Sequence, residues 1–445
     1  MNRATLVCIL TMPLTALACG GSAGEPDAGD PSDAATADAE TPSDAGHDGG
    51  RDAGPLPEDG GPAPTLTVER WGERLYGPVL AMRRIERELW IGTGQVMDPS
   101  LGETAPVRSA LARLDLDTGA LRVFEEELPT ARHWSGVDGP TPTASVVADG
   151  ARRIAASRAG LLVIEDDAVT AHALTVGGAS ASPTHLALDR AGGRARLLAS
   201  TDQGLVELDP DTLAVRDTLS LAALGGMPGS LAVDPSTGAI YVAVHPDEAA
   251  SRVARVLEGA VTTLVPGEDG APPGAVGDVV FSETLGGALV ALASWDPRGG
   301  GVMLWDGDEA RTLVDEDALS RAARGESVAF GASTLAYDEG SGVLVVGGRI
   351  HATGPIGILE GGGLAWVDVS DASAEPRLYG LSTSTSAIRG DVVTAAAYDP
   401  VDRRTYVALQ QPCNELRIGN VGIHAIYFDR GEPRSSCRSS RASAI

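Results

Sequence analysis

Residues 230–243 read SLAVDPSTGAIYVA, which is two apolar strands joined by an Asp-Pro-Ser-Thr-Gly turn. An Asp at the start of such a turn accepts hydrogen bonds from nearby backbone N–H groups, and Pro and Gly set the φ angles that the turn needs. Related strand-turn-strand units recur along the chain. Their acids, here called marker acids, are 40 to 61 residues apart and stand at Asp149, Asp189, Asp234, Glu283, Asp338 and Asp399.

A further apolar strand follows these strand-turn-strand units, and seven copies of this strand occur along the chain. The seven copies lie at Ala110–Asp115, Gly160–Glu165, Gly204–Asp209, Arg252–Val256, Gly301–Asp306, Gly363–Asp368 and Gly422–Tyr427. A short outer strand then completes a four-stranded unit. Four strands per repeat and periods near 40–50 residues are typical of propeller blades. We therefore predict an all-β fold, a β-propeller of seven four-stranded blades over residues 65–430.

The last unit has only three strands before the chain becomes coil-like. The strand at Thr65–Trp71 has no blade of its own. We expect it to pair with the last unit and close the ring, which removes two exposed sheet edges at once.

Tyr241-Val242 and Tyr406-Val407 resemble the first half of the Tyr-Val-Thr-Asn repeat of bacterial propellers and of the lactonase-like propellers related to them. This resemblance implies a propeller scaffold. Such scaffolds include lactonases, an antibiotic-ring lyase and many binding proteins without chemistry, so the resemblance does not choose a function.

The amino terminus predicts export. Arg3 precedes an apolar run that ends at Ala18, too short to span a bilayer and typical of a signal peptide over residues 1–18. Residues 15–20 read TALACG and resemble the lipobox of bacterial lipoproteins, which implies acylation of Cys19. The alternative is an ordinary signal peptide cleaved near Ala18. The resemblance, with Gly20 after the cysteine, favours the outer membrane, with the lipid as the only membrane contact.

Residues 19–64 are rich in Asp, Gly, Ala and Pro and contain no aromatic residue. Such a segment cannot bury enough apolar surface to become ordered, so we expect a disordered acidic tether.

Residues 431–445 form a C-terminal tail. Cys413 and Cys437 are an even pair in an oxidising compartment, so we predict a disulfide, with reactive or metal-bound thiols as the alternative.

The composition excludes some functions. The net charge is −27 and all 34 basic residues are Arg, because the chain contains no Lys. A negative surface repels phosphate backbones, so nucleic acid is not expected as a partner. Schiff-base chemistry on a lysine is impossible. We expect a monomer whose partner is an envelope protein or a small polar ligand.

Long loops at 92–107, 347–362 and 410–421 fall in blades one, six and seven, which are neighbours in a closed ring. Recognition usually resides in such loops, so we expect a ligand-binding rim there. Each polar candidate can equally be a solvated side chain. The candidates are Gln95, Asp98, Arg349, His351, Gln410, Asn414, Glu415 and Arg417.

The central channel is the second candidate site. Aligning the inner strands on the marker acids puts one His and several hydroxyls at one level, and Asp278, Ser333 and Thr394 at the level before it. This ring can bind a small polar ligand or hold only water. The aligned level consists of Ser145, His185, Ser230, Val279, Thr334 and Ala395.

Two common catalytic motifs are absent from the sequence: it has no His-Glu-x-x-His and no Walker loop. The sequence therefore favours a binding or scaffolding lipoprotein without a cofactor. The alternatives are a purely structural display protein and a lactonase- or lyase-like enzyme with His185 and Asp278 as catalytic residues. The lactonase resemblance would imply calcium.

Overall fold

The computed structural model describes residues 65–71, 78–97, 106–132, 137–247, 249–267, 274–293, 300–315, 318, 327–354, 357–370, 376–379, 392–410 and 423–429, all inside the compact unit Ala53–Ile445. The signal peptide (1–18), Cys19, the tether (19–64), the Cys413–Cys437 disulfide and the tail (431–445) lie outside these residues and stay predictions. In the described part, no helix combines the length and the apolar character needed to cross a bilayer.

The described residues form seven four-stranded antiparallel sheets, here numbered as blades one to seven from the inner strand outward. Blade one is β2 (Val79–Ile85), β3 (Glu88–Thr93), β6 (Leu111–Asp115) and β7 (Leu121–Val123). Blade two is β10 (Thr143–Asp149), β11 (Arg152–Ser157), β12 (Gly160–Glu165) and β13 (Ala168–His172). Blade three is β16 (Pro183–Asp189), β17 (Arg196–Thr201), β18 (Gly204–Leu208) and β19 (Val215–Ser220). Blade four is β20 (Met227–Val233), β21 (Ile240–His245), β22 (Arg252–Leu257) and β23 (Ala260–Leu264).

The later blades have the same order. Blade five is β24 (Ala275–Ser282), β25 (Gly287–Ala293), β26 (Gly301–Trp305) and β27 (Ala310–Val314). Blade six is β28 (Ser327–Asp338), β29 (Val343–Gly354), β30 (Gly357–Asp368) and β31 (Arg377–Tyr379). Blade seven is β32 (Val392–Asp399), β33 (Arg404–Gln410), β34 (Ile423–Asp429) and β1 (Thr65–Trp71). Between blades lie the pairs β4 (Val96–Met97) with β5 (Val107–Arg108), β8 (Thr130–Arg132) with β9 (Asp138–Pro140), and β14 (Thr175–Val176) with β15 (Ala179–Ser180), and the short helices η3 (Ala191–Gly193) and α1 (Leu221–Leu224).

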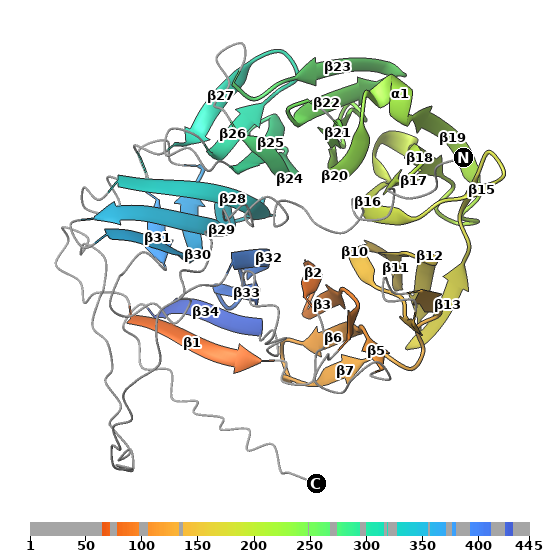
Figure 1. Cartoon of the computed structure of the whole chain (residues 1–445), viewed down its shortest axis with the longest axis horizontal. Helices are drawn as coiled ribbons and strands as arrows, with labels where there is room; N and C mark the ends of the chain where they lie inside the picture. Colours follow the sequence, from red (N-terminus) through yellow and green to blue (C-terminus); the bar gives the residue numbers. More distant parts are fainter. Residues whose placement is uncertain are drawn as a thin grey trace, which may run out of the picture. The chain divides into compact units, whose positions relative to one another are not determined.

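The inner strands form a closed circle around a central axis. β2, β10, β16, β20, β24, β28 and β32 each contact the next in that order, and β32 contacts β2 again (Figure 1). The ring closes as expected, because β1 pairs with β34 from Thr65↔Asp429 to Trp71↔Ile423. The chain is therefore an all-β propeller with four-stranded blades, which confirms the predicted fold class. The apolar strand that the sequence repeats seven times is the third strand of each sheet.

Packing between blades buries the sheet faces. One apolar cluster joins Leu89 and Ile91 of blade one to Ala395, Ala397 and Tyr406 of blade seven. Other clusters join blades five and six, four and five, and two and three. Since each sheet lies between two others, both of its faces can be apolar, as the repeated apolar strands require.

Every inner strand carries a β-bulge at the same place, where two residues oppose one on the second strand. The opposing residue is small and buried in every blade. Near the axis the blades are closest, and a larger side chain would strike the next inner strand: a Cβ on Gly92 would lie 2.4 Å from the Thr143 carbonyl oxygen. The seven opposing residues are Gly92, Ala156, Ser200, Ala243, Ala291, Gly347 and Ala408.

The marker position of blade five was assigned wrongly. Strand β24 ends at Ser282, which is fully buried and pairs with Gly287. Its hydroxyl accepts the Leu285 N–H, as Asp234 accepts the N–H groups of its own turn. Glu283 is one residue further and exposed. A hydroxyl can replace a carboxylate in this turn, so aligning on acids alone shifted the blade by one residue.

A polar contact joins each pair of neighbouring blades. At the junction of blades seven and one, the fully buried Asp399 forms an ion pair with Arg84 Nε at 3.1 Å and accepts a hydrogen bond from Arg87 Nη1 at 2.7 Å. Arg provides four of the seven contacts, since its planar fork can pair with two acceptors at once. The other six contacts are Arg153–Glu88, Arg190–Asp149, Arg194 to the Pro235 carbonyl, Tyr241 to the Asp306 carbonyl, Ser282 to Tyr337, and Trp366 to Thr405.

The predicted loop of blade six is instead a continuous hairpin. Strands β29 and β30 stay paired from Val343↔Asp368 to Gly354↔Gly357, so residues 347–354 and 357–362 extend the sheet. The glycines of this segment lie inside the ladder, and one of them, Gly348, faces the Gly331 carbonyl with no room for a Cβ. In blade one, the predicted loop contains the β4–β5 pair. Residues 411–421 of blade seven lie outside the described part.

We expect Gly92→Ala to lower the free energy of unfolding by about 1–3 kcal/mol, because its Cβ forces blades one and two apart at the axis. Gly340→Ala is the control: its nearest neighbour would be Asp338 Oδ2 at 3.7 Å, and it should change stability by less than about 0.5 kcal/mol. Denaturant unfolding of both variants measures the difference. Equal stabilities would contradict the close-packing explanation.

Candidate functional site

The first candidate site is the bulge level of the inner strands. When Ser282 replaces Glu283 as the marker position of blade five, Asp278 takes the place in this level that the sequence alignment gives to Val279. Val279 then lies one residue further along β24. The structure thus brings the two proposed catalytic residues, His185 and Asp278, to one level of the axis. The corrected level consists of Ala81, Ser145, His185, Ser230, Asp278, Thr334 and Ala395.

Polar side chains at this level bind the next blade. Ser145 Oγ accepts the Leu186 N–H at 3.1 Å, and Ser230 Oγ accepts the Val279 N–H at 3.2 Å. The Ser230 hydroxyl donates to Asp278. These serines satisfy backbone groups that the bulges leave unpaired, so they have a structural role whether or not a ligand binds.

Asp278 is surrounded by hydrogen-bond donors. Oδ1 accepts the Val279 N–H at 2.9 Å and the Ser230 hydroxyl, and Oδ2 accepts the Leu335 N–H at 2.9 Å. Burial raises the pKa of Asp278, and the hydrogen bonds from Ser230, Leu335, Val279 and Thr334 oppose that rise. Its oxygens are therefore largely used within the protein, which favours a role in fixing blades four, five and six.

His185 lies among protein atoms near the axis. Burial lowers the pKa of His185 to about 4, and the neighbouring His245 contributes to the lowering. Nδ1 of His185 lies 3.2 Å from the Thr184 hydroxyl. At neutral pH the imidazole is uncharged. Its Nε2 atom can then donate or accept one hydrogen bond, depending on the tautomer. The sequence did not single out His245, which ends β21 and packs over Gly229.

Sequence reasoning also missed Arg83, which lies on β2 two residues after the bulge level. Solvent reaches this side chain, yet enough protein atoms surround it to desolvate the guanidinium, as expected for a group on the inner strand of a propeller channel. Burial lowers the pKa of Arg83, and the charge of Asp278 acts against that change. Blade one has no Asp turn, so the alignment on marker acids did not include it.

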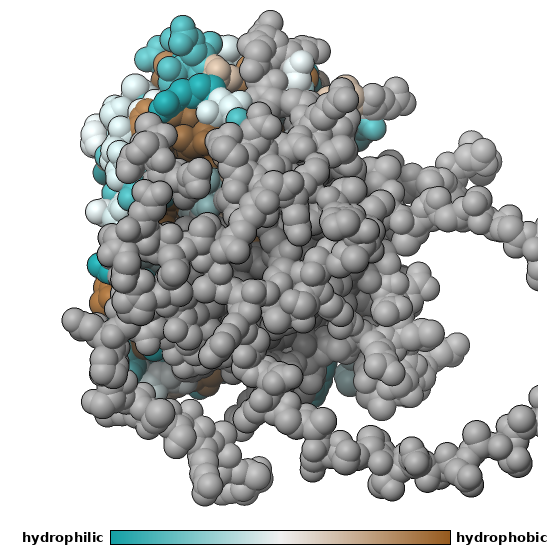
Figure 2. Space-filling view, turned by 90° about the vertical axis from the view of Figure 1, so that its left-hand side faces the viewer, coloured by the Kyte–Doolittle hydropathy of each residue, from teal (hydrophilic) through white to brown (hydrophobic). Residues whose placement is uncertain are grey.

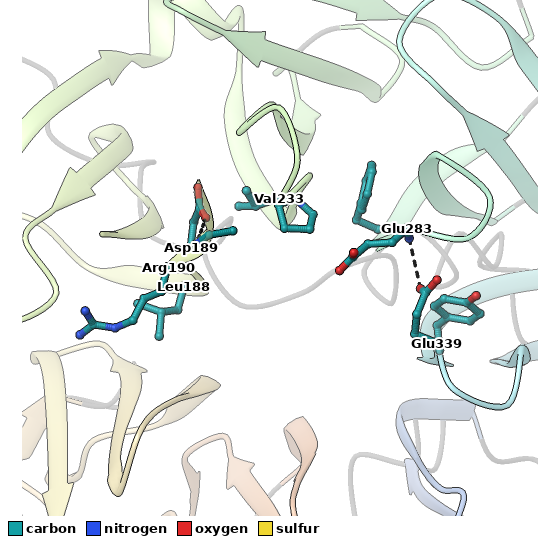
Figure 3. A pocket seen from close by; sticks show the side chains of 10 residues that line it. Leu188, Asp189, Arg190, Val233, Glu283 and Glu339 are labelled. Carbon is teal, nitrogen blue, oxygen red and sulfur yellow. Dashed lines mark hydrogen bonds between the residues drawn. The ribbon is translucent and has the colours of Figure 1, made fainter. Parts of the chain in front are cut away.

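A cavity of about 280 Å³ opens at the end of the inner strands where the marker positions lie. Figure 3 shows Asp189 and Val233 on one side of it and Glu283 and Glu339 on the other, with the Glu283 N–H bonded to Glu339 at 3.1 Å. The remaining lining is Leu188, Arg190, Ala191, Pro235, Phe281 and Tyr337. This end of the ring is opposite to the one where the sequence placed the binding rim.

The rim candidates have different positions. Gln95 Nε2 donates to the carbonyls of Ala131 at 3.1 Å and Pro140 at 2.9 Å, so its amide holds the β8–β9 pair in place. Arg349 and His351 lie in the extended part of β29, and Gln410 is the last residue of β33. Asp98, Asn414, Glu415 and Arg417 lie outside the described residues. Their ligand-binding roles remain predictions.

Two further predicted positions lie on inner strands. Thr334 belongs to the corrected bulge level, and Thr394 is the extra residue in the bulge of β32. The Thr394 hydroxyl is buried and has no hydrogen-bond partner within the described part of the chain. The described residues contain no group of three or more His, Cys, Asp or Glu arranged to bind a metal ion.

No known family model matches the chain, and no curated protein resembles it in sequence. Similar solved structures exist. The β-propeller domain of Cps50 (Swd1) from Myceliophteria thermophila is 9% identical, with a TM-score of 0.50 over 82% of this chain and 99% of that one. YCF48 bound to D1 peptide is 12% identical, with a TM-score of 0.49 over 83% and 97%. The likeness is one of fold.

The lowered pKa of His185 predicts a pH dependence of stability. An unfolded His binds a proton below about pH 6.5, whereas folded His185 does so only near pH 4. Stability should therefore fall as the pH drops from 6.5 to 4, and His185→Gln should remove about 2 kcal/mol of that loss. Unfolding of both proteins across this pH range measures the difference. Parallel curves would show that His185 is not desolvated.

Proposed function

We propose that this chain is an exported lipoprotein of the bacterial cell envelope whose propeller binds or scaffolds a protein partner. The observation that carries the proposal is the extended hairpin of blade six, together with the β4–β5 pair of blade one, two blades further around the ring. Propellers commonly use additions of this kind on a rigid ring for recognition.

The hairpin of blade six is a long platform. Strand β29 has 12 residues, whereas β11 and β17 each have 6. The extra residues lie beyond the bulge, on the side away from the marker turns. Its ladder is continuous, so the platform presents a paired backbone whose shape does not have to form on binding.

Charge and polarity favour a polar protein surface as the partner. In the described part, Val215 and Val401 are the exposed large hydrophobic residues. Figure 2 views the propeller from the side of blade six; the coloured residues, most of them near the top of the view, include both hydrophilic and hydrophobic ones. A net charge of −27 opposes nucleic acid, which supports a protein with a basic or neutral binding surface.

A small-molecule enzyme is the second candidate, because His185 and Asp278 share a level of the axis. The hydrogen bonds that occupy Asp278 argue against it as a proton acceptor. A substrate converted by the wild-type protein and not by His185→Gln would favour this candidate.

The rim proposal predicts loss of partner capture when the hairpin is shortened. Removing residues 349–352 and 359–362 deletes paired positions on both strands and joins Gly348 and Gly363 to the pair Thr353↔Ile358. We expect crosslinking on intact envelopes to recover at least about tenfold less partner. The control removes residues 176–179 from the β14–β15 pair of blade three. Equal recovery with both variants would overturn the rim proposal.

The anchor proposal predicts that Cys19→Ser releases the protein from membranes. Without an acyl chain, no other membrane contact is expected to hold it. Fractionation should recover the variant in the soluble periplasmic fraction, and metabolic labelling with a fatty acid should be lost. Cys413→Ser is the control and should remain labelled and sedimentable. A labelled Cys19→Ser protein would show that lipid is attached elsewhere.

A further inference from the structure

Arg83 is an exception on its level of the inner strands. The level two residues after the bulge is otherwise occupied by small apolar side chains, at Val147, Ala187, Ala232, Val280, Ala336 and Ala397. Arg83 is thus a charged residue at a level where other members, such as Val147, Ala232 and Ala397, are buried between blades. A structural role would be expected to give this Arg an acceptor on a neighbouring strand.

Nearby arginines have such acceptors, whereas Arg83 forms no ion pair with any described residue. Arg84 and Arg87 both bind the buried Asp399. Asp278 interacts with Arg83 only through its charge, and the Asp278 oxygens already accept the Ser230 hydroxyl and two backbone N–H groups. The guanidinium therefore keeps donors and positive charge that no described side chain satisfies.

The 280 Å³ cavity provides space and access at this end of the axis. Leu188, Val233 and Phe281 line it, and each is the next residue along its strand after the level of Arg83. Arg83 lies on blade one and is not part of this lining, so a ligand that contacts both must extend along the axis. Of the three acids on the lining, Asp189 binds Arg194 and Arg196, Glu339 accepts the N–H of Glu283, and the Glu283 carboxylate forms no ion pair with any described residue.

We propose that the axial channel binds a small oxyanion, a carboxylate or phosphate group, through the guanidinium of Arg83. The fork of an Arg matches the two oxygens of such a group, and a site partly removed from water strengthens the charged hydrogen bonds. The site lies at the opposite end of the ring from the rim, so it is independent of the proposed partner surface.

The test is a thermal-shift titration of the purified full chain with sodium succinate, sodium phosphate and, at matched ionic strength, sodium chloride. Binding to the native state raises the midpoint in proportion to the logarithm of ligand over dissociation constant. We expect succinate or phosphate to raise the midpoint and chloride not to. Arg83→Met should weaken binding at least about tenfold, and Arg83→Lys less. Arg311→Met, on the exposed face of β27, is the matched control.

A shift with succinate alone identifies an organic acid as the ligand class, and a shift with phosphate alone identifies a phosphorylated one. Either result, if lost in Arg83→Met and kept in Arg311→Met, supports the proposal. No shift with either anion overturns it, as does an equal shift in wild type and Arg83→Met. If Arg83→Met does not fold, isothermal titration of Arg83→Lys and Arg83→Gln gives the same comparison.

Discussion

Both faces of each blade are apolar, so a blade is stable only when a neighbour covers each face. A row of blades would leave two faces open, and a closed ring leaves none. Closure depends on the pairing of β1 with β34, which joins the start of the propeller to its end. The bulges and the small residues opposite them, from Gly92 to Ala408, then allow seven sheets to meet at one axis. The candidate sites inherit their geometry from this constraint.

The repeat and the closing strand could be predicted because they depend on local turn chemistry and strand patterning. The Asp-Pro-Ser-Thr-Gly turn at residues 234–238 and the apolar third strands are signals that a single sequence carries. The level of Asp278 could not be predicted correctly, because Ser282 performs the turn role of an acid with a hydroxyl. Arg83 was missed because blade one turns through Glu86 at positive φ without an Asp.

The blade-six hairpin shows a different limit. The extra length of blade six predicts a loop at 347–362, yet residues 347–354 and 357–362 lie in paired strands. Glycine is required at Gly347 because Val393 of the next blade is too close for a Cβ, and at Gly348 because of the Gly331 carbonyl. The reason is tertiary packing, which a local pattern does not reveal. The partner proposed for this hairpin and the ligand proposed for the axis depend on side-chain chemistry that the fold does not determine.

Closure by an amino-terminal strand also determines the order in which the molecule can fold. Strand β1 is made first, but its partner β34 is the last strand of the propeller, so almost the whole chain must be present before the two can meet. Contacts so distant in sequence form slowly, and until they form two sheet edges are open to pairing with other chains. A nascent chain therefore passes through an open ring whose sheet edges can pair with other chains, and this topology favours protection by a chaperone during the interval.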